Sequence, residues 1–209
     1  MSQYPKSPLM GQMMSQPLLI SNLIRHAERY FGDTEIVSRR VEGDIHRYTY
    51  RDCHKRARQM ANALAKLGVG MGQRVATLAW NGYRHLELYY AISGSGAVMH
   101  TVNPRLHAEQ IAYIFNHAED QYLFLDMNFL PVVEAIAESC KTVKGFVMMC
   151  DRDRMPAESS VPNLLCYKDL IAANSSMFEW LLFDENSASG LCYTWCFPAQ
   201  RWMARRCTS

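Results

Sequence analysis

The stretch "RVATLAWNGYRHLELYYAISGSGAVMHTVN", residues 74–103, contains the pattern that decides the fold. It opens with an apolar run at 74–80 and closes with another at 97–103, and both have the length and composition of buried strands. Between them, residues 83–96 have the character of a helix that stops in glycines. A strand, a helix and a second strand in this order predict a parallel βαβ unit.

The same alternation continues along the chain. Further strands are predicted at 121–126, 144–150 and 190–194, and further helices at 107–119, 128–140 and 166–174. The connection 151–165 is polar and contains proline, so it is predicted to be a loop. Hydrophobic strands that alternate with helices indicate a parallel sheet with helices on both faces.

The region before this alternation has a different organisation. A helix is predicted at 17–32, a β-hairpin at 35–50 and a long helix at 49–68. Thr49 can cap the long helix, and Asp52, three positions on, can return the hydrogen bond as in a capping box. The predicted fold class is therefore α/β, with a mostly parallel sheet flanked by helices and an N-terminal hairpin.

Composition excludes several classes of protein. The 209 residues carry a net charge of +2 with scattered Lys and Arg, which argues against a nucleic-acid-binding protein. No secretory signal and no run of eighteen apolar residues occur, so neither secretion nor a membrane span is expected. The seven cysteines follow no disulfide or CxxC spacing, and Cys192, Cys196 and Cys207 are not spaced as zinc ligands. A reducing, cytoplasmic location is expected.

Polar residues at the carboxyl ends of the predicted strands are the candidate site residues, because ligands of open α/β sheets bind there. Trp80 and Asn81 follow the first strand and either border a small-molecule site or form a packed loop. His100 lies within a strand, where a structural role is favoured over a catalytic one. The same edge includes the segment 126–128 and whatever follows Thr194.

Other motifs carry little chemistry. "SGSG" at 93–96 follows a helix and precedes a strand, which is the wrong order for a dinucleotide-binding loop, so it is interpreted as a helix end and turn. Asp151 and Asp153 are interpreted as solvated loop charges. No GxSxG or HExxH motif is present.

A family resemblance adds to this. The segments Tyr48-Thr49-Tyr50-Arg51, Gly68-Val69 with Gly72, Arg74-Val75-Ala76, Gly96-Ala97-Val98 and Asn103-Pro104-Arg105-Leu106 stand in the order and spacing seen in one family. Over residues 18 to 194 the chain resembles the AMP-forming acyl-CoA synthetases of the adenylate-forming superfamily. Within them, "HTVNPRL" at 100–106 is similar to the medium- to long-chain fatty-acid CoA ligases.

The resemblance implies a two-step reaction. A fatty-acid carboxylate attacks the α-phosphate of ATP to give an acyl-adenylate and pyrophosphate, and the CoA thiol then displaces AMP. The implied cofactors are ATP, Mg²⁺ and CoA. In the family, a phosphate-binding loop of the form T-S-G-T-T-G-x-P-K-G follows a strand that ends in Tyr-Thr. Here Thr194 matches the start of that loop, and it is the only candidate site residue that the resemblance supplies.

The chain departs from the family after Thr194. Residues 195–209, "WCFPAQRWMARRCTS", contain no glycine, no lysine and no series of hydroxyls. Such a break is what translation in a shifted reading frame would produce, and a genuine alternative terminus is the other interpretation.

The expected organisation is an N-terminal arm at 1–17, a partial N-terminal synthetase domain at 18–194 and an unpatterned tail at 195–209 outside the fold. Whether this chain is itself an enzyme is left open.

Three functions remain to be distinguished. The first is the N-terminal part of a fatty-acid CoA ligase that is inactive by itself. The second is a non-catalytic, truncated partner of an intact ligase, and a dimer formed through the N-terminal region is a possible arrangement. The third is a stand-alone nucleotide-binding module, against which the missing phosphate loop argues.

Overall fold

The main sheet has seven strands, and β3 lies at its centre. The computed structural model describes residues 16–194 and 205–208. Within them the strand order is β7-β6-β5-β3-β4-β8-β9. The strands are β3 (Arg74–Leu78), β4 (Val98–Thr101), β5 (Tyr122–Leu125), β6 (Gly145–Met148), β7 (Leu164–Cys166), β8 (Gly190–Thr194) and β9 (Arg205–Thr208). All neighbours pair in parallel except β8 and β9, which confirms the predicted α/β class.

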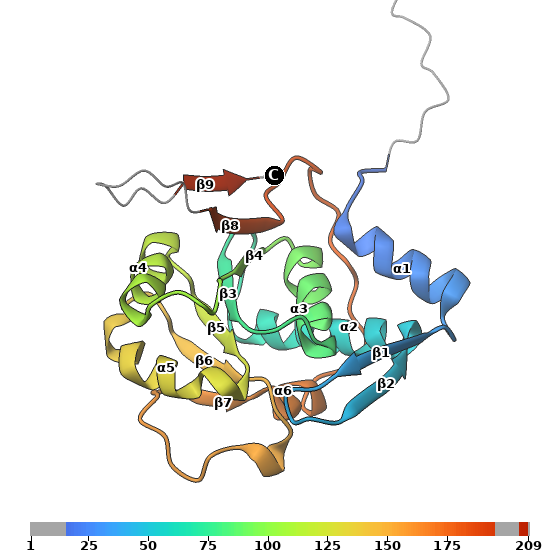
Figure 1. The fold of residues 1–209 in the computed structure, drawn as a ribbon. Helices are drawn as coiled ribbons and strands as arrows, with labels where there is room; N and C mark the ends of the chain where they lie inside the picture. The colour runs from blue at the N-terminus through green and yellow to red at the C-terminus, as the bar shows by residue number, and fades with distance from the viewer. Residues whose placement is uncertain (1–15, 195–204, 209) are drawn as a thin grey trace, which may run out of the picture.

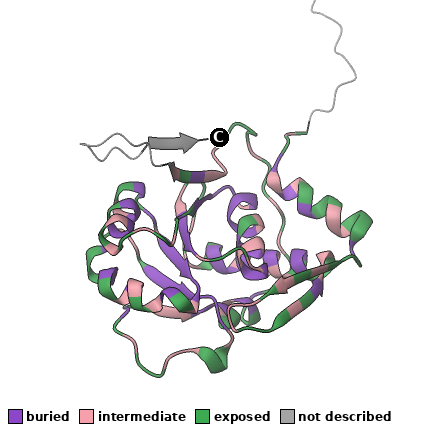
Figure 2. Cartoon of the chain, in the orientation of Figure 1, coloured by how far each residue is buried: buried purple, intermediate pink, exposed green. Residues whose placement is uncertain are grey.

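Helices cover both faces of this sheet (Figure 1). On one face lie α2 (Tyr50–Lys66), α3 (Tyr83–Gly94) and α6 (Tyr167–Ala172), and on the other lie α4 (Ala108–Ala118) and α5 (Leu130–Ile136). Alternate residues of each strand supply the two cores, as the two-residue period of a strand requires. Val75 packs in the first core and Ala76 and Leu78 pack in the second. Figure 2 shows the central strands as the most continuously buried part of the molecule.

The N-terminal elements form a separate unit against α2 and α3. Helix α1 (Ile20–Phe31) is followed by a two-stranded antiparallel sheet of β1 (Glu35–Arg39) and β2 (Ile45–Thr49). The predicted capping box is confirmed: the N–H of Asp52 donates to the Thr49 hydroxyl, and the Asp52 carboxylate accepts from the N–H of Thr49.

Three regions differ from the sequence prediction. The prediction of a loop over 151–165 was wrong at its end, because Leu164 and Leu165 begin β7 and pair with β6. A strand of three residues is too short to show a recognisable hydrophobic pattern in the sequence. Whether such a segment forms a strand depends on its pairing with a neighbouring strand. The helix predicted at 128–140 is interrupted, with 3₁₀ turns at Met127–Phe129 and Ala137–Ser139 on either side of α5. A further 3₁₀ turn lies at Arg152–Arg154.

Part of the predicted tail forms a strand. Arg205–Thr208 form β9, antiparallel to β8, whereas the expectation was an unpatterned segment outside the fold. Residues 195–204 lie outside the described part of the chain, as do residues 1–15 of the predicted arm. The division into arm, domain and tail therefore stays a prediction.

A buried ion pair joins the helices of the first face. The Arg56 Nε donates to Glu87 Oε1 at 2.7 Å, and the Tyr167 hydroxyl donates to Glu87 Oε2 at 2.7 Å. The Glu87 side chain is fully buried, and this burial raises its pKa. Because α2, α3 and α6 each contribute one partner, these contacts fix the three helices relative to one another.

The segment between α6 and β8, residues 173–189, runs across the helices α2 and α3 without forming a helix or strand, and we call it the strap. The ring of Trp180 lies against Gly94, where any side chain would collide with it. Its indole Nε1 donates to His54 Nε2 at 2.8 Å, and His54 Nδ1 lies 2.5 Å from Glu28 Oε2. An indole N–H can only donate, so His54 Nε2 accepts and Nδ1 carries the proton. Burial lowers the pKa of His54, which agrees with a neutral ring.

We expect Arg56→Met to destabilise the fold by about 3–5 kcal/mol, because it leaves the carboxylate of Glu87 buried without its cation. The exposed pair of Arg47 and Glu35, with an N–O distance of 2.6 Å, is the matched control. Arg47→Met should cost less than about 1 kcal/mol. Urea unfolding of both variants at neutral pH measures the difference, and equal losses would contradict the role given to the buried pair.

Candidate functional site

The order of the strands creates a crevice beside β3. The chain runs from β3 through α3 to β4 on one side, then returns through α4 to β5 on the other side of β3. The two helices therefore lie on opposite faces of the sheet, and they diverge at the carboxyl ends of β3 and β4. In open parallel sheets this topological switch point is where ligands bind.

A cleft of about 350 Å³ lies at this point. We call it the switch-point cleft. Its walls come from the end of β3, the segment after β4, the first turn of α3 and the middle of β8, and its lining includes Thr77, Trp80, Asn81, His85, Asn103 and Cys192. The structure thus brings together Trp80 and Asn81 with Asn103 and Pro104, which are far apart in the sequence.

Among residues 16–194 and 205–208, no Asp, Glu, Lys or Arg lines the switch-point cleft. The hydroxyl of Thr77 lies 3.2 Å from Nε2 of His85, and burial lowers the pKa of His85, which favours its neutral form. The rest is amide, hydroxyl, thiol, indole and aliphatic surface. These described side chains can exchange a few hydrogen bonds with an uncharged group.

A second, smaller depression of about 40 Å³ lies on the other side of Trp80 and Asn81, beneath the β1–β2 hairpin. This one is charged: its lining includes Arg40, Arg84 and Asp126. The loop of Trp80 and Asn81 therefore separates an uncharged cleft from a charged depression.

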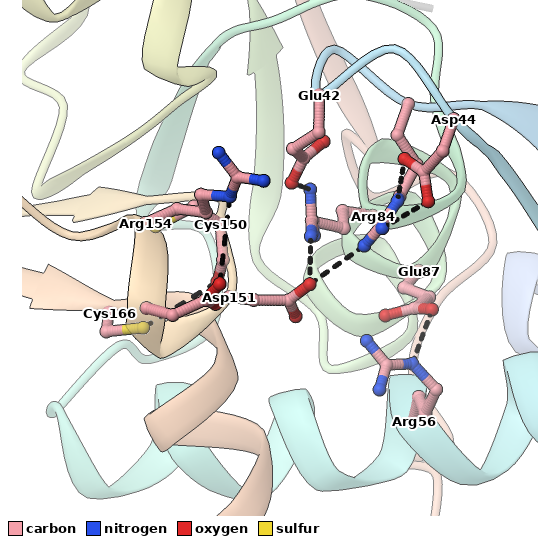
Figure 3. Close-up of polar contacts among 11 residues, drawn as sticks. Glu42, Asp44, Arg56, Arg84, Glu87, Cys150, Asp151, Arg154 and Cys166 are labelled. Atoms are coloured by element: carbon pink, nitrogen blue, oxygen red, sulfur yellow. Dashed lines mark hydrogen bonds and ion pairs between the residues drawn. The ribbon is translucent and has the colours of Figure 1, made fainter.

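Ion pairs hold the hairpin over this charged depression (Figure 3). Arg84 donates from Nη1 to Glu42 Oε1 at 2.8 Å, and its Nη2 lies 3.5 Å from Asp151 Oδ2. Arg40 also contacts Asp151 Oδ2 at 2.8 Å and pairs with Asp44. The interpretation of Asp151 as a solvated charge was wrong, because two arginines from other elements reach it. Asp153 has a largely exposed side chain, as predicted.

Asp126 lines the charged depression and contacts the loop that borders both depressions. It follows β5, and its Oδ2 accepts the main-chain N–H of Trp80 at 2.7 Å. Burial raises the pKa of Asp126 to about 6, although the bond from Trp80 acts in the opposite direction. A neutral carboxyl group is therefore present at mildly acidic pH directly beneath the Trp80–Asn81 loop.

Two sequence interpretations are confirmed away from the cleft. His100 Nδ1 lies 2.8 Å from Asp120 Oδ2, both side chains are fully buried, and neither lines the cleft, so His100 is structural. The "SGSG" segment ends α3 and turns into β4, with Gly96 at a φ of 79°. It lies where β4 begins, at the amino end of the sheet.

Residues His85 and Cys192 were missed by sequence reasoning. His85 is in the first turn of the helix that follows β3, and Cys192 is two residues before Thr194 on a strand whose neighbour is β4. Knowledge that β8 pairs with β4 would have been needed to place Cys192 in the cleft, and no local pattern gives this pairing.

Thr194 ends β8, which runs parallel to β4. Since Cys192 pairs with Thr101, the main chain of Thr194 lies at the carboxyl edge of the sheet, where a phosphate loop is expected in this type of fold. The binding role of Thr194 stays a prediction.

The described residues do not by themselves fit ATP and Mg²⁺. The switch-point cleft offers no cation to a phosphate, and within 16–194 and 205–208 no three His, Cys, Asp or Glu side chains gather to hold a metal. None of the helices in this part of the chain has the length and apolarity to cross a bilayer.

The raised pKa of Asp126 predicts a pH-dependent stability difference. The folded state binds the proton more tightly than the unfolded chain, so the wild type loses stability as pH rises from about 4 to about 6. Asp126→Asn keeps an acceptor for Trp80 and removes this loss. Its stability relative to wild type should therefore increase by up to about 3 kcal/mol between pH 4 and pH 7.

Urea unfolding across this pH range tests the prediction. Asp126→Ala serves as a second variant. Unlike Asp126→Asn, it has no acceptor for the Trp80 N–H, so it should be about 1 kcal/mol less stable than Asp126→Asn at each pH. A difference between Asp126→Asn and wild type that does not change with pH would contradict the prediction.

Solved structures share this architecture. The chain superposes on an acyl-CoA synthetase from Brucella canis with a TM-score of 0.72 and 13% identity, covering 92% of this chain and 33% of that one. It superposes on an anthranilate CoA ligase in complex with anthranoyl-AMP with a TM-score of 0.71 and 20% identity, covering 85% and 32%. At these identities the similarity establishes the fold alone.

Sequence comparisons give the family. The chain is 52% identical over 186 residues to a 3-methylmercaptopropionyl-CoA ligase from Ruegeria lacuscaerulensis and 46% identical to a medium-chain-fatty-acid–CoA ligase from Ectopseudomonas oleovorans, each match covering 89% of this chain and 34% of the relative. A long-chain-fatty-acid–CoA ligase from Thermus thermophilus is 43% identical, with coverages of 87% and 32%. The chain thus spans about a third of the length of these relatives. The family model of the AMP-binding enzymes matches residues 23–193, and the chain belongs to this family.

Proposed function

We propose that this chain is the N-terminal part of an acyl-CoA ligase that activates a medium- or long-chain fatty acid. The observation that carries the proposal is the identity of 43–52% to acyl-CoA ligases over nearly the whole described chain. The position of β8 beside β4 supports it, because this pairing brings Thr194 to the edge of the sheet at which the switch-point cleft opens.

The substrate class rests on a narrower argument. The names of the similar ligases specify 3-methylmercaptopropionyl, medium-chain and long-chain acyl groups, all of which are aliphatic. The uncharged lining of the switch-point cleft is consistent with a site that handles an uncharged group next to the reacting carboxylate. Among these acyl groups we favour a fatty acid, because of the segment 100–106.

The proposed reaction joins a carboxylate to CoA through an acyl-adenylate. ATP, when bound, supplies the activated phosphate, with Mg²⁺ to offset its charge, and CoA supplies the thiol. In this arrangement the described residues have a scaffolding role. The β3–β4–β8 edge presents the cleft and Thr194, and Asp126 holds the Trp80–Asn81 loop between the two depressions through the Trp80 N–H. Cations for the phosphates have to come from residues beyond this cleft.

We expect the 209-residue chain to lack adenylation activity by itself. Residues 195–209 contain neither glycine nor lysine, so the sequence after Thr194 lacks residue types of the family's phosphate-binding loop. An ATP–pyrophosphate exchange assay with fatty acids of several lengths should give the rate of the blank. Exchange that depends on a fatty acid and exceeds the blank would contradict this expectation.

A chimera tests the function itself. Residues 1–194 are joined to the part of the Ruegeria lacuscaerulensis ligase that follows its equivalent strand, and acyl-CoA formation is measured with 3-methylmercaptopropionate and with medium- and long-chain fatty acids. We expect activity, because residues 1–194 then supply the N-terminal third of a complete ligase. A folded chimera that forms no acyl-CoA from any of these acids, when the parent ligase is active, would refute the proposal.

Within the active chimera, the role of Thr194 can be tested directly. If its hydroxyl contributes to binding the phosphates, Thr194→Ala should lower kcat by about a hundredfold, the typical effect of losing one donor to a developing charge. Thr34→Ala, an exposed threonine between α1 and β1, is the matched control and should leave kcat unchanged. Equal activity of Thr194→Ala and the parent chimera would remove Thr194 from the site.

A further inference from the structure

The carboxyl end of β8 extends beyond its pairing with β4. The last residue pair that the two parallel strands share is Thr101 with Cys192. Because β4 ends at Thr101, its main chain does not pair with Tyr193 and Thr194. In this chain those two residues pair with β9, which lies outside the residues 23–193 that match the family. Without β9, contacts of side chains remain to fix this end of β8.

Tyr193 contacts α4 through its hydroxyl and its ring. The hydroxyl oxygen lies 2.6 Å from Nδ1 of His117, which is in the last turn of α4. The Tyr193 ring packs against the second core, and its centroid lies 5.8 Å from that of the His117 ring in an edge-on arrangement. Side chains alternate along a strand, so Tyr193 points to the α4 face while Cys192 lines the switch-point cleft. Tyr193 therefore connects β8 to α4 without entering the cleft.

His100 of β4 supports the same ring. The centroid of the His100 ring lies 5.2 Å from that of Tyr193, and its Nδ1 lies 2.8 Å from Asp120 Oδ2. The side chains of His100 and Asp120 are both fully buried, so this pair has little freedom to move. The Tyr193 ring thus packs on a fixed group of β4 while its hydroxyl meets α4.

We propose that Tyr193 and His117 are positioning residues for the adenylation step. Their hydrogen bond holds the end of β8 against α4, and this places the main chain of Thr194 and the phosphate loop that follows it in a complete ligase. A hydrogen bond has a preferred direction, whereas apolar packing has none, so this contact can orient the end of a strand. The inference rests on the proposed function, because it concerns the loop that binds the phosphates of ATP.

The two half-reactions of the active chimera test the proposal. The phosphate loop serves the first step, which ATP–pyrophosphate exchange measures. The second step, thioester formation from added acyl-adenylate and CoA, takes place after pyrophosphate has left. We expect Tyr193→Phe and His117→Leu each to lower the exchange rate about tenfold, between the effect of one hydrogen bond and that of a misplacement of about 1 Å. Thioester formation should keep the rate of the parent chimera.

Further variants separate the hydrogen bond from packing. Both single changes remove the same bond, so the double variant should lose no more exchange activity than either single variant. His117→Asn places an amide close to the position of Nδ1 and should restore most of the exchange rate that His117→Leu loses. Tyr113→Phe is the matched control. Tyr113 is on the same helix, with its ring centroid 5.5 Å from that of His117, and loss of its hydroxyl should leave both half-reactions unchanged.

Hydrogen exchange of the 209-residue chain tests the contact without any assay of activity. Tyr193→Phe and His117→Leu should each speed exchange of the main-chain N–H groups of β8 about fivefold, because one hydrogen bond no longer opposes local opening. Exchange in β3 and β5 should not change. Unchanged exchange in β8 would overturn the proposal.

The outcomes with the chimera separate this proposal from the proposed function. An inactive, folded parent chimera refutes the proposed function, and the positioning role fails with it. An active parent whose variants keep the full rate of ATP–pyrophosphate exchange overturns the positioning role alone. Equal losses in both half-reactions would also overturn it, because a contact that only stabilises the fold lowers the amount of active enzyme for both steps.

Discussion

The parallel pairing of β3 with β4 on one side and β5 on the other is the constraint on which the rest of the structure depends. Parallel strands need a crossover between them, and the crossovers are right-handed, so a reversal of direction along the sheet sends α3 and α4 to opposite faces. This reversal creates the crevice at the carboxyl ends of β3 and β4. The two hydrophobic cores, the cleft and the position of β8 all follow from it.

Polar contacts between distant segments then set the details around this crevice. Glu87 accepts hydrogen bonds from Arg56 and Tyr167 in the core of one face. Arg84 pairs with Glu42 at the tip of the hairpin and also contacts Asp151. Asp126 fixes the main chain at Trp80. These buried or half-buried groups are costly to leave unpaired, so each one restricts where a neighbouring element can lie. They give the edge of the sheet a charged side and an uncharged side.

Sequence reasoning predicted most of the elements, because the strands and helices of this chain have clear apolar periods and ends. The capping box of Thr49 and Asp52, the α/β class and the structural nature of His100 were all correct. The errors fall where local pattern carries no information. Strand β7 has three residues and is defined by its pairing with β6, and Asp151 seemed solvated because its arginine partners are more than sixty residues away.

By itself, the sequence determined the fold class and the family, because these depend on residue order and on periodicity within short windows. Only the tertiary structure decided that Trp80, Asn103 and Cys192 share one uncharged cleft and that Glu28 turns inward to meet His54. The physical reason is that a cleft and an ion pair each depend on which distant segments meet. That is set by strand pairing and packing across the whole chain, which no short stretch of sequence contains.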